Sequence, residues 1–226
     1  MKILFKYPTR SRRDWFKKTL ATYYTMISSG CKYEFMITLN KDDASMNNSE
    51  IRAFLNSQPN LKYAYGDHAT KIEACNADVD CNKDWDILVL VSDDMIPIVK
   101  DFDKIIVDQM TKFFPDTDGA LNFNDGMYGQ DQCITFSIIG KKLYKRFGYI
   151  YHPAYRSFYC DNEFTDEVKQ MGKCHYDPRV IVKHKWHGGP NSKDALYRRN
   201  SGMKGDCKIY NRRKLLGFPK DLSWRL

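Results

Sequence analysis

The stretch Ile87-Leu88-Val89-Leu90-Val91-Ser92-Asp93-Asp94 decides the fold of this chain. Its first five residues form an unbroken apolar run, which is typical of a strand buried on both faces of a parallel sheet. The run ends at a serine and two adjacent carboxylates, and carboxylates are costly to bury unless water, cations or hydrogen bonds satisfy them. We therefore predict a central strand over residues 87–91 that carries a polar loop at its carboxyl end.

The segments around this strand alternate between strand and helix patterns. Before it, we predict strands over residues 2–7, 33–39 and 61–65 and helices over residues 14–28, 49–55 and 70–78. After it the pattern is less regular, with apolar segments at residues 120–123, 134–139 and 180–182 and a helix over residues 162–171. This alternation indicates an α/β fold with a mostly parallel sheet flanked by helices, in which ligands bind beyond the carboxyl ends of the strands.

The composition narrows the class of protein. Of the 226 residues, 42% are hydrophobic, which is enough for one buried core and too few for a second full domain. The run at residues 87–91 is far too short to span a bilayer, and residues 1–7 do not have the pattern of a signal peptide. We therefore expect a cytoplasmic protein without a membrane span. Seven scattered cysteines without a C-x-x-C spacing disfavour a structural zinc site and indicate reduced thiols.

The net charge of +8 is concentrated at one end of the chain. Residues 183–226 hold 12 Lys or Arg against three Asp, interleaved with Trp186, Tyr197, Tyr210 and Trp224. A positive surface beside a site attracts anions such as a sugar diphosphate, an acidic glycan or a nucleic acid. A solvated basic tail is the alternative interpretation.

The paired carboxylates suggest a metal site. Asp93 and Asp94 offer hard oxygen ligands of the kind that Mg²⁺ or Mn²⁺ prefers, and such an ion can bridge diphosphate oxygens. A solvated turn would also explain them. His184 and His187 follow the apolar segment at residues 180–182 and could complete the same metal site, or they could be ordinary polar residues at a sheet edge.

Two further segments carry candidate functional groups. Asp161 follows an aromatic loop at residues 148–155, so it could be a general base beside a stacking surface, or simply the N-cap of the next helix. The segment Pro8-Thr9-Arg10 follows the first strand and offers hydroxyl and guanidinium donors to a nucleoside or its phosphates. The chain has no G-x-G-x-x-G and no Walker A pattern, which disfavours dinucleotide and P-loop sites.

In their order along the chain, these residues resemble the inverting GT-A glycosyltransferases, especially the short ones of bacteria, phages and large DNA viruses. The resemblance covers roughly residues 2–187 and includes the loop after the first strand, the acidic loop Asp42-Asp43, the segment at residues 71–76, Ser92-Asp93-Asp94, and Cys160-Asp161-Asn162-Glu163-Phe164. It implies a GT-A domain over residues 1–187, with residues 188–226 as a basic C-terminal extension that packs on or near the active site. If the source is a phage or a virus, the expected location is the host cytoplasm.

The resemblance also implies a role for each matched residue. Asp94 would be the principal ligand of Mn²⁺ or Mg²⁺, helped by His187 or His184, and Asp161 would be the base. Asp93 would face the ribose or the sugar. The nucleotide pocket of the donor, which is a UDP-sugar in our preferred interpretation, would be lined by Pro8, Thr9, Arg10, Asp42 and Lys71.

Two departures from the family's pattern concern the metal and the acceptor. The metal motif begins with Ser92 in place of Asp, which removes one carboxylate, and Cys160 replaces the usual Glu before the base. The acceptor is therefore open between a glycan and DNA with hydroxymethylated bases. A sugar-phosphate nucleotidyltransferase is a second possible enzyme class, but it usually needs a glycine-rich loop after the first strand. A non-enzymatic nucleic-acid-binding protein is the third possibility, and it gives no reason for the aspartates to gather.

Overall fold

The computed structural model describes residues 1–80, 82–126, 131–185 and 202–220. Within these residues the main sheet has seven strands in the order β3-β2-β1-β4-β7-β6-β8. The first four in this order, β3 (Leu61–Gly66), β2 (Lys32–Asn40), β1 (Lys2–Pro8) and β4 (Ile87–Leu90), are parallel. Strand β7 (Ile138–Gly140) is antiparallel to both of its neighbours, β4 and β6 (Ala120–Phe123), while β6 and β8 (Cys174–Asp177) are parallel. The prediction of a mostly parallel α/β sheet is therefore confirmed.

The helices of the first half follow the predicted positions closely. They are α1 (Arg13–Met26), α2 (Ser49–Asn56) and α3 (Lys71–Asn76). Thr70 caps α3 as its sequence pattern predicts, because its hydroxyl accepts a hydrogen bond from the Glu73 amide at 3.1 Å. Helix α1 ends two residues before the predicted Ser28, whose amide and hydroxyl instead donate to the buried carboxylate of Asp103.

The second half contains elements that the sequence analysis did not predict. They are the short strand β5 (Met95–Pro97), helices α4 (Phe102–Phe113) and α5 (Lys141–Phe147), and strand β8. Helix α6 (Cys160–Gln170) starts two residues earlier than predicted. The apolar segments at 134–139 and 180–182 were assigned the wrong limits, because the strands found there are β7 and β9 (Val182–His184). Strand β9 pairs with β5 in a separate two-stranded sheet.

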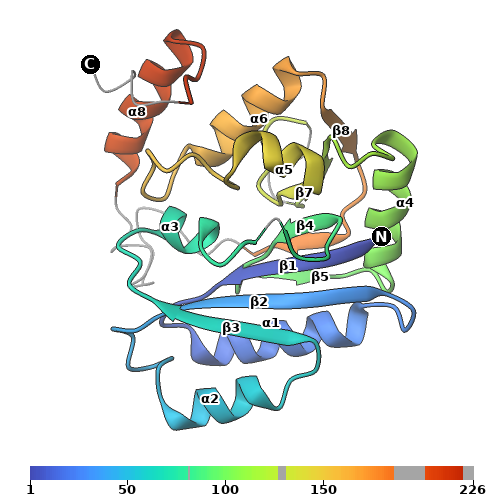
Figure 1. The fold of residues 1–226 in the computed structure, drawn as a ribbon, viewed down its shortest axis with the longest axis vertical. Helices are drawn as coiled ribbons and strands as arrows, with labels where there is room; N and C mark the ends of the chain where they lie inside the picture. Colours follow the sequence, from blue (N-terminus) through green and yellow to red (C-terminus); the bar gives the residue numbers. More distant parts are fainter. Residues whose placement is uncertain (81, 127–130, 186–201, 221–226) are drawn as a thin grey trace.

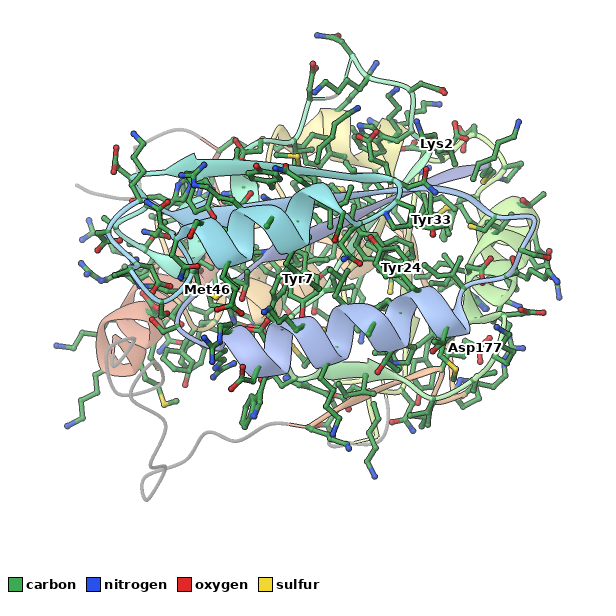
Figure 2. The ribbon with its side chains drawn as sticks, turned by 90° about the horizontal axis from the view of Figure 1, so that it is seen from below. Lys2, Tyr7, Tyr24, Tyr33, Met46 and Asp177 are labelled. Carbon is green, nitrogen blue, oxygen red and sulfur yellow. The ribbon has the colours of Figure 1, made fainter. Side chains whose placement is uncertain are left out.

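Two hydrophobic cores lie on opposite faces of the sheet. Helices α1, α2 and α4 cover one core, and α3, α5 and α6 cover the other (Figure 1). Figure 2 shows Tyr7, Tyr24 and Tyr33 in the layer between α1 and the strands. Along β4 and the next residue, Ile87, Val89 and Val91 belong to the first core and Leu88 and Leu90 to the second. The central strand is thus buried on both faces, as predicted, and its carboxyl end is fixed firmly in the molecule.

The described part of the C-terminal extension forms a helix, α8 (Met203–Leu215), beside α6 (Figure 1). The expected division of the chain at residue 187 stays a prediction. Among the described residues, no helix is both long enough and apolar enough to cross a membrane. The six cysteines that the structure describes are free thiols, as expected.

Candidate functional site

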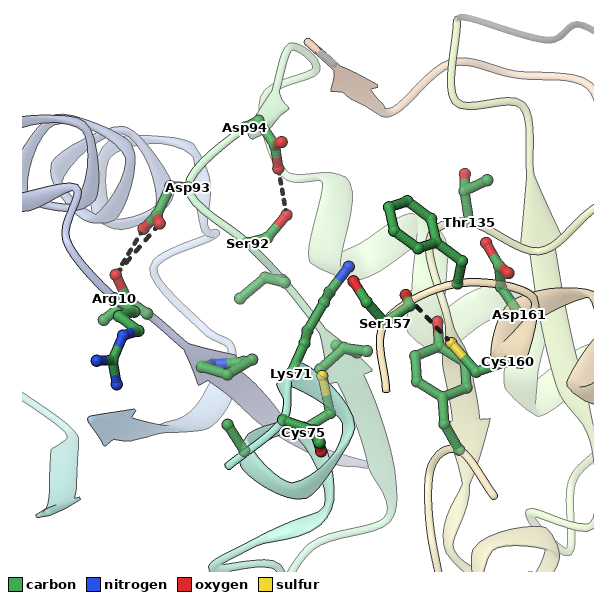
Figure 3. Close-up of a pocket in the computed structure, with 18 of the residues that line it drawn as sticks. Arg10, Lys71, Cys75, Ser92, Asp93, Asp94, Thr135, Ser157, Cys160 and Asp161 are labelled. Atoms are coloured by element: carbon green, nitrogen blue, oxygen red, sulfur yellow. Dashed lines mark hydrogen bonds between the residues drawn. The ribbon is translucent and has the colours of Figure 1, made fainter. Parts of the chain in front are cut away.

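A cavity of about 560 Å³ opens at the carboxyl ends of the parallel strands. Its walls come from the loops after β1, β2, β3 and β4, from the start of α6, and from the end of β9 (Figure 3). Eight of the ten predicted site residues line it, namely Pro8, Thr9, Arg10, Lys71, Asp93, Asp94, Asp161 and His184. Asp42, which was expected in the nucleotide pocket, is not among the residues that line the cavity. Groups that are more than 150 residues apart in sequence therefore share one cavity, as the position of binding sites in α/β sheets predicts.

Asp93 is a buried carboxylate at the base of the cavity. It accepts hydrogen bonds from the Thr9 hydroxyl at 3.0 Å and the Tyr7 hydroxyl at 3.1 Å, and both donors come from the end of β1. Its main-chain oxygen accepts from Thr19 on α1 at 2.8 Å. Burial raises the pKa of Asp93 to about 7, although the Arg12 charge and these two hydrogen bonds act to lower it. Asp93 therefore ties the loop after β4 to the loop after β1.

Asp94 faces the cavity and is surrounded by cationic groups. Its carboxylate lies 3.8 Å from His184 Nε2 and 3.7 Å from the Arg12 guanidinium, and it accepts a hydrogen bond from the Ser92 hydroxyl. Burial acts to raise the pKa of Asp94, but His184, Ser92 and Lys71 hold it well below its usual value. The carboxylate is thus charged and faces the cavity, as a metal or cation ligand must.

Strand pairing brings His184 beside Asp94. Strand β9 pairs with β5, so that His184 lies opposite Met95, the residue that follows Asp94. The Lys185 amide also donates to the Asp94 main-chain oxygen at 2.7 Å. The second candidate histidine, His187, lies outside the described residues.

A second carboxylate, Asp125, was missed by the sequence analysis. It is buried and lies 3.8 Å from His184 Nδ1, and it accepts a hydrogen bond from the Thr135 hydroxyl at 2.7 Å. Burial acts to lower the pKa of His184, but Asp125 and Asp94 outweigh it and raise the pKa to about 9. Asp125 follows the apolar segment at residues 120–123, and a carboxylate after a buried strand is the same signal that identified Asp94.

Arg10 and Asp42, two of the residues predicted to bind the nucleotide, lie in the loops after β1 and β2. Arg10 forms a two-pronged ion pair with Asp42, with distances of 2.7 and 2.8 Å. The neighbouring Asp43 is the buried member of the acidic loop, and it accepts hydrogen bonds from the Ser11 amide at 2.7 Å and the Ser45 hydroxyl at 2.6 Å. Asp43 thus holds the loops after β1 and β2 together, which leaves the Arg10–Asp42 pair at the exposed rim.

Lys71 runs across the middle of the cavity, as Figure 3 shows, between the Asp94 side and the Asp161 side. Burial acts to lower the pKa of Lys71, but neighbouring groups that include Asp94 and Asp161 raise it overall. Its ammonium therefore supplies a positive charge between the two carboxylates.

Asp161 lies on the wall opposite Asp94, together with Ser157 and Cys160 (Figure 3). The expectation that it occupies the N-cap of the helix is wrong. Helix α6 starts at Cys160, its N-cap residue is Tyr159 with a φ of 60°, and Asp161 is the second helical residue. A carboxylate in the first turn benefits from the positive end of the helix dipole without being used as a cap. One carboxylate oxygen of Asp161 accepts a hydrogen bond from the Asn162 amide at 3.0 Å, and the residue lines the cavity.

Comparisons with known proteins identify the fold. No family model matches this chain, and no curated protein matches it in sequence. Its structure is similar to the mannosyltransferase PcManGT from Pyrobaculum calidifontis in complex with GDP-Man and Mn²⁺, with a TM-score of 0.70 and 14% identity. That match covers 95% of this chain and 64% of the mannosyltransferase.

The structure is also similar to residues 1–349 of S. aureus TarS, with a TM-score of 0.62 and 14% identity, over 81% of this chain and 60% of TarS. For the complex of the same TarS segment with UDP-GlcNAc the TM-score is 0.63 at 13% identity, over 96% and 71% of the two chains. The chain thus spans less than two thirds of the mannosyltransferase and of the first TarS structure. The similarity is one of fold, and it agrees with the strand order and with the position of the cavity: this chain has a GT-A-type glycosyltransferase fold.

Proposed function

We propose that this protein is a metal-dependent glycosyltransferase that transfers a sugar from a nucleotide-sugar, preferably a UDP-sugar, to a hydroxyl acceptor with inversion. The observation that carries the proposal is the cavity itself, in which Asp94 and His184 face Asp161 across Lys71. The fold of the chain supports it, because solved structures of this fold hold GDP-Man with Mn²⁺ and UDP-GlcNAc.

The residues beside Asp94 fit a divalent cation. Among the residues described, no group of three His, Cys, Asp or Glu is arranged as a complete metal site. Asp94 and His184 nevertheless supply a carboxylate and an imidazole, and a cation that bound to His184 would displace the proton that its raised pKa retains. Mn²⁺ and Mg²⁺ accept such ligands together with phosphate oxygens and water. A cation bound there would neutralise the leaving diphosphate.

Lys71 and the residues after β1 would bind the nucleotide. Lys71 brings an ammonium group that suits a phosphate, and the Arg10–Asp42 pair at the rim offers donors and acceptors to a nucleoside. Pro8 and Thr9 also line the cavity. Because Thr9 donates to Asp93, a ribose hydroxyl that approached Asp93 would meet a carboxylate already held in place.

Asp161 would act as the base. Transfer with inversion requires a proton acceptor on the face of the sugar opposite to the leaving group, and Asp161 lies on the wall opposite Asp94. The buried thiols Cys75 on α3 and Cys160 on α6 also line the cavity, and burial raises the pKa of each, so they remain neutral. Asp161 is therefore the carboxylate suited to remove the acceptor proton.

The acceptor would enter beside Phe158, Tyr159 and Met203, which line the cavity on the Asp161 side. Aromatic faces suit either a sugar ring or a base, and the exposed Lys204 and Lys208 on α8 suit a polyanion. A charged glycan and DNA with hydroxymethylated bases both have this chemistry.

A thermal-shift experiment tests the proposal. Wild-type protein is heated with UDP, GDP, CDP or ADP, each with and without Mn²⁺, and beside it the Asp94→Asn variant and the control Asp108→Asn, whose exposed carboxylate lies on α4 away from the cavity. We expect one nucleotide, UDP by preference, to raise the Tm only with Mn²⁺ present in wild type and the control, and not in the Asp94 variant. Equal stabilisation of the Asp94 variant would contradict the metal assignment, and no stabilisation of wild type by any nucleotide would contradict the proposed function.

A further inference from the structure

The cavity wall that carries Asp161 includes a short segment of irregular backbone. Ser157, Phe158 and Tyr159 line the cavity directly before α6 begins. Tyr159 adopts the left-handed conformation, which is uncommon for a residue with a side chain and persists only where the surrounding structure imposes it. The position of Asp161, two residues later, therefore depends on whatever holds this segment.

The group that holds it belongs to α8. Asp206 accepts hydrogen bonds from three consecutive main-chain amides, those of Arg156 at 3.1 Å, Ser157 at 2.9 Å and Phe158 at 2.8 Å. Asp206 is only 1% exposed. A charged acceptor forms stronger hydrogen bonds than a neutral one, and these amides precede the helix, so they have no intrahelical partner.

Two further contacts fix the same segment from the other sides. The Tyr155 hydroxyl donates to Glu163 on α6 at 2.6 Å, and the Arg156 main-chain oxygen accepts from the Ile72 amide on α3 at 3.4 Å. The Glu163 amide in turn donates to the Tyr159 oxygen at 3.1 Å and so closes the first turn of α6. The segment is thus held between three helices, and Asp206 contributes the most bonds to it.

We propose that Asp206 is a positioning residue, which fixes the acceptor-side wall at residues 156–159 and through it the first turn of α6 with Asp161. This rests on the proposed function for its consequence in catalysis. Met203, one turn before Asp206 on the same helix, lines the cavity itself, so α8 contributes both the anchor and part of the wall. The C-terminal helix is then a component of the acceptor site.

The test compares Asp206→Asn with Asp166→Asn. Asp166 is the matched control, because it also joins α6 to α8, through the Tyr210 hydroxyl at 2.7 Å and Lys214 at 2.8 Å, but does not touch the segment or the cavity. Asparagine keeps the shape of Asp206 but removes its charge and turns one acceptor into a donor that opposes an amide. Asp206→Glu, which keeps the charge and shifts it, serves as a milder second variant if the asparagine variant does not fold.

Amide hydrogen exchange gives the first result and needs no activity. In Asp206→Asn we expect exchange at Ser157, Phe158 and Glu163 to be at least about 10-fold faster than in wild type, the low end for losing a hydrogen bond to a charged group. In Asp166→Asn we expect wild-type exchange at the same amides. Unchanged exchange at Ser157 and Phe158, or a change that stops before Glu163, would overturn the proposal.

Steady-state transfer gives the second result. In Asp206→Asn we expect kcat to fall about 10-fold or the acceptor KM to rise as much, while the Kd for nucleotide with Mn²⁺ stays within about twofold of wild type. Wild-type kinetics together with faster exchange would overturn the role in catalysis. If wild type transfers no sugar at all, the proposed function fails, and the exchange data still decide whether Asp206 positions the wall.

Discussion

The buried ion pair between Arg213 on α8 and Glu163 on α6 is expected to hold the C-terminal helix in place. Arg213 Nε and Nη2 each donate to a separate oxygen of Glu163 at 2.8 Å, and the two side chains are 0% and 1% exposed. Replacing Arg213 by Met removes one partner and leaves a buried carboxylate with the Tyr155 hydroxyl as its remaining donor among the described contacts.

Breaking a buried pair in this way costs about 3–5 kcal/mol, because the surviving charge stays buried. Typical domains have a stability of about 5–15 kcal/mol, so the loss is a large part of the total. For a chain of this size it corresponds to a fall in Tm of roughly 6–20 °C. The double variant Arg213→Met/Glu163→Gln removes the stranded charge, and we expect it to be more stable than Arg213→Met alone by about 1–2 kcal/mol.

Urea unfolding of Arg213→Met and of the double variant measures these differences. Lys214→Met is the control, because Lys214 pairs with Asp166 at the surface of the same two helices. We expect this control to unfold close to the wild-type midpoint. If Arg213→Met loses less than about 1 kcal/mol, or if the double variant is no more stable than the single one, the pair does not anchor α8 as argued.

Three further predictions concern the base, a buried glutamate and the acceptor. Asp161→Asn should keep the nucleotide Kd near wild type and lower turnover at least ~100-fold, as expected when a general base is lost. Turnover is measured in a transfer assay, and a value within a few-fold of wild type would exclude that role for Asp161. Burial raises the pKa of Glu167 to about 7, so the folded chain holds this proton more tightly than the unfolded chain and stability falls as pH rises from its ordinary value of 4.5 to about 7. Glu167→Gln should therefore stabilise the protein at pH 8 by on the order of 1 kcal/mol and have little effect near pH 4.5, and equal urea midpoints for both proteins at pH 8 would contradict this. If DNA is the acceptor, anisotropy titration of the full chain should show affinity that falls steeply between ~50 and ~200 mM salt, and no binding at low salt would leave the glycan.

The sequence predicts well which residues gather on the Asp94 side of the cavity, because this side follows regular elements. An apolar run followed by carboxylates identifies both β4 and the position of Asp94, and strand–helix alternation identifies the loop that contains Thr9 and the helix that begins at Lys71. In α4, Phe102, Ile106 and Met110 recur every four residues, so its core-facing pattern was present and was overlooked. For α5, the glycine at position 148, with a φ of 75°, was the missed stop signal.

The cavity wall beside α8 is harder to predict, because charged residues stabilise it. Helix α8 has only a small apolar contact, in which Ile209 and Tyr210 pack against the second core, and its buried residues are Asp206 and Arg213. Sequence patterns assign such residues to solvent, since a buried charge is stable only beside a partner that lies far away in sequence. The partners here are the amides before α6 and the carboxylate of Glu163, some 50 residues earlier, and no local pattern connects them.

The attachment of α8 also has a consequence for the order in which the molecule is made. The amides at residues 156–158 are synthesised well before the Asp206 carboxylate that receives them, whereas the strands that hold Thr9, Asp93 and Asp94 have all been made by residue 94. The wall at residues 156–159 therefore cannot be held in this way until α8 has been synthesised and has packed on α6. Until α8 is in place, the segment at residues 156–158 lacks three of its hydrogen bonds, so under the proposed function an incomplete chain would have no fixed acceptor wall.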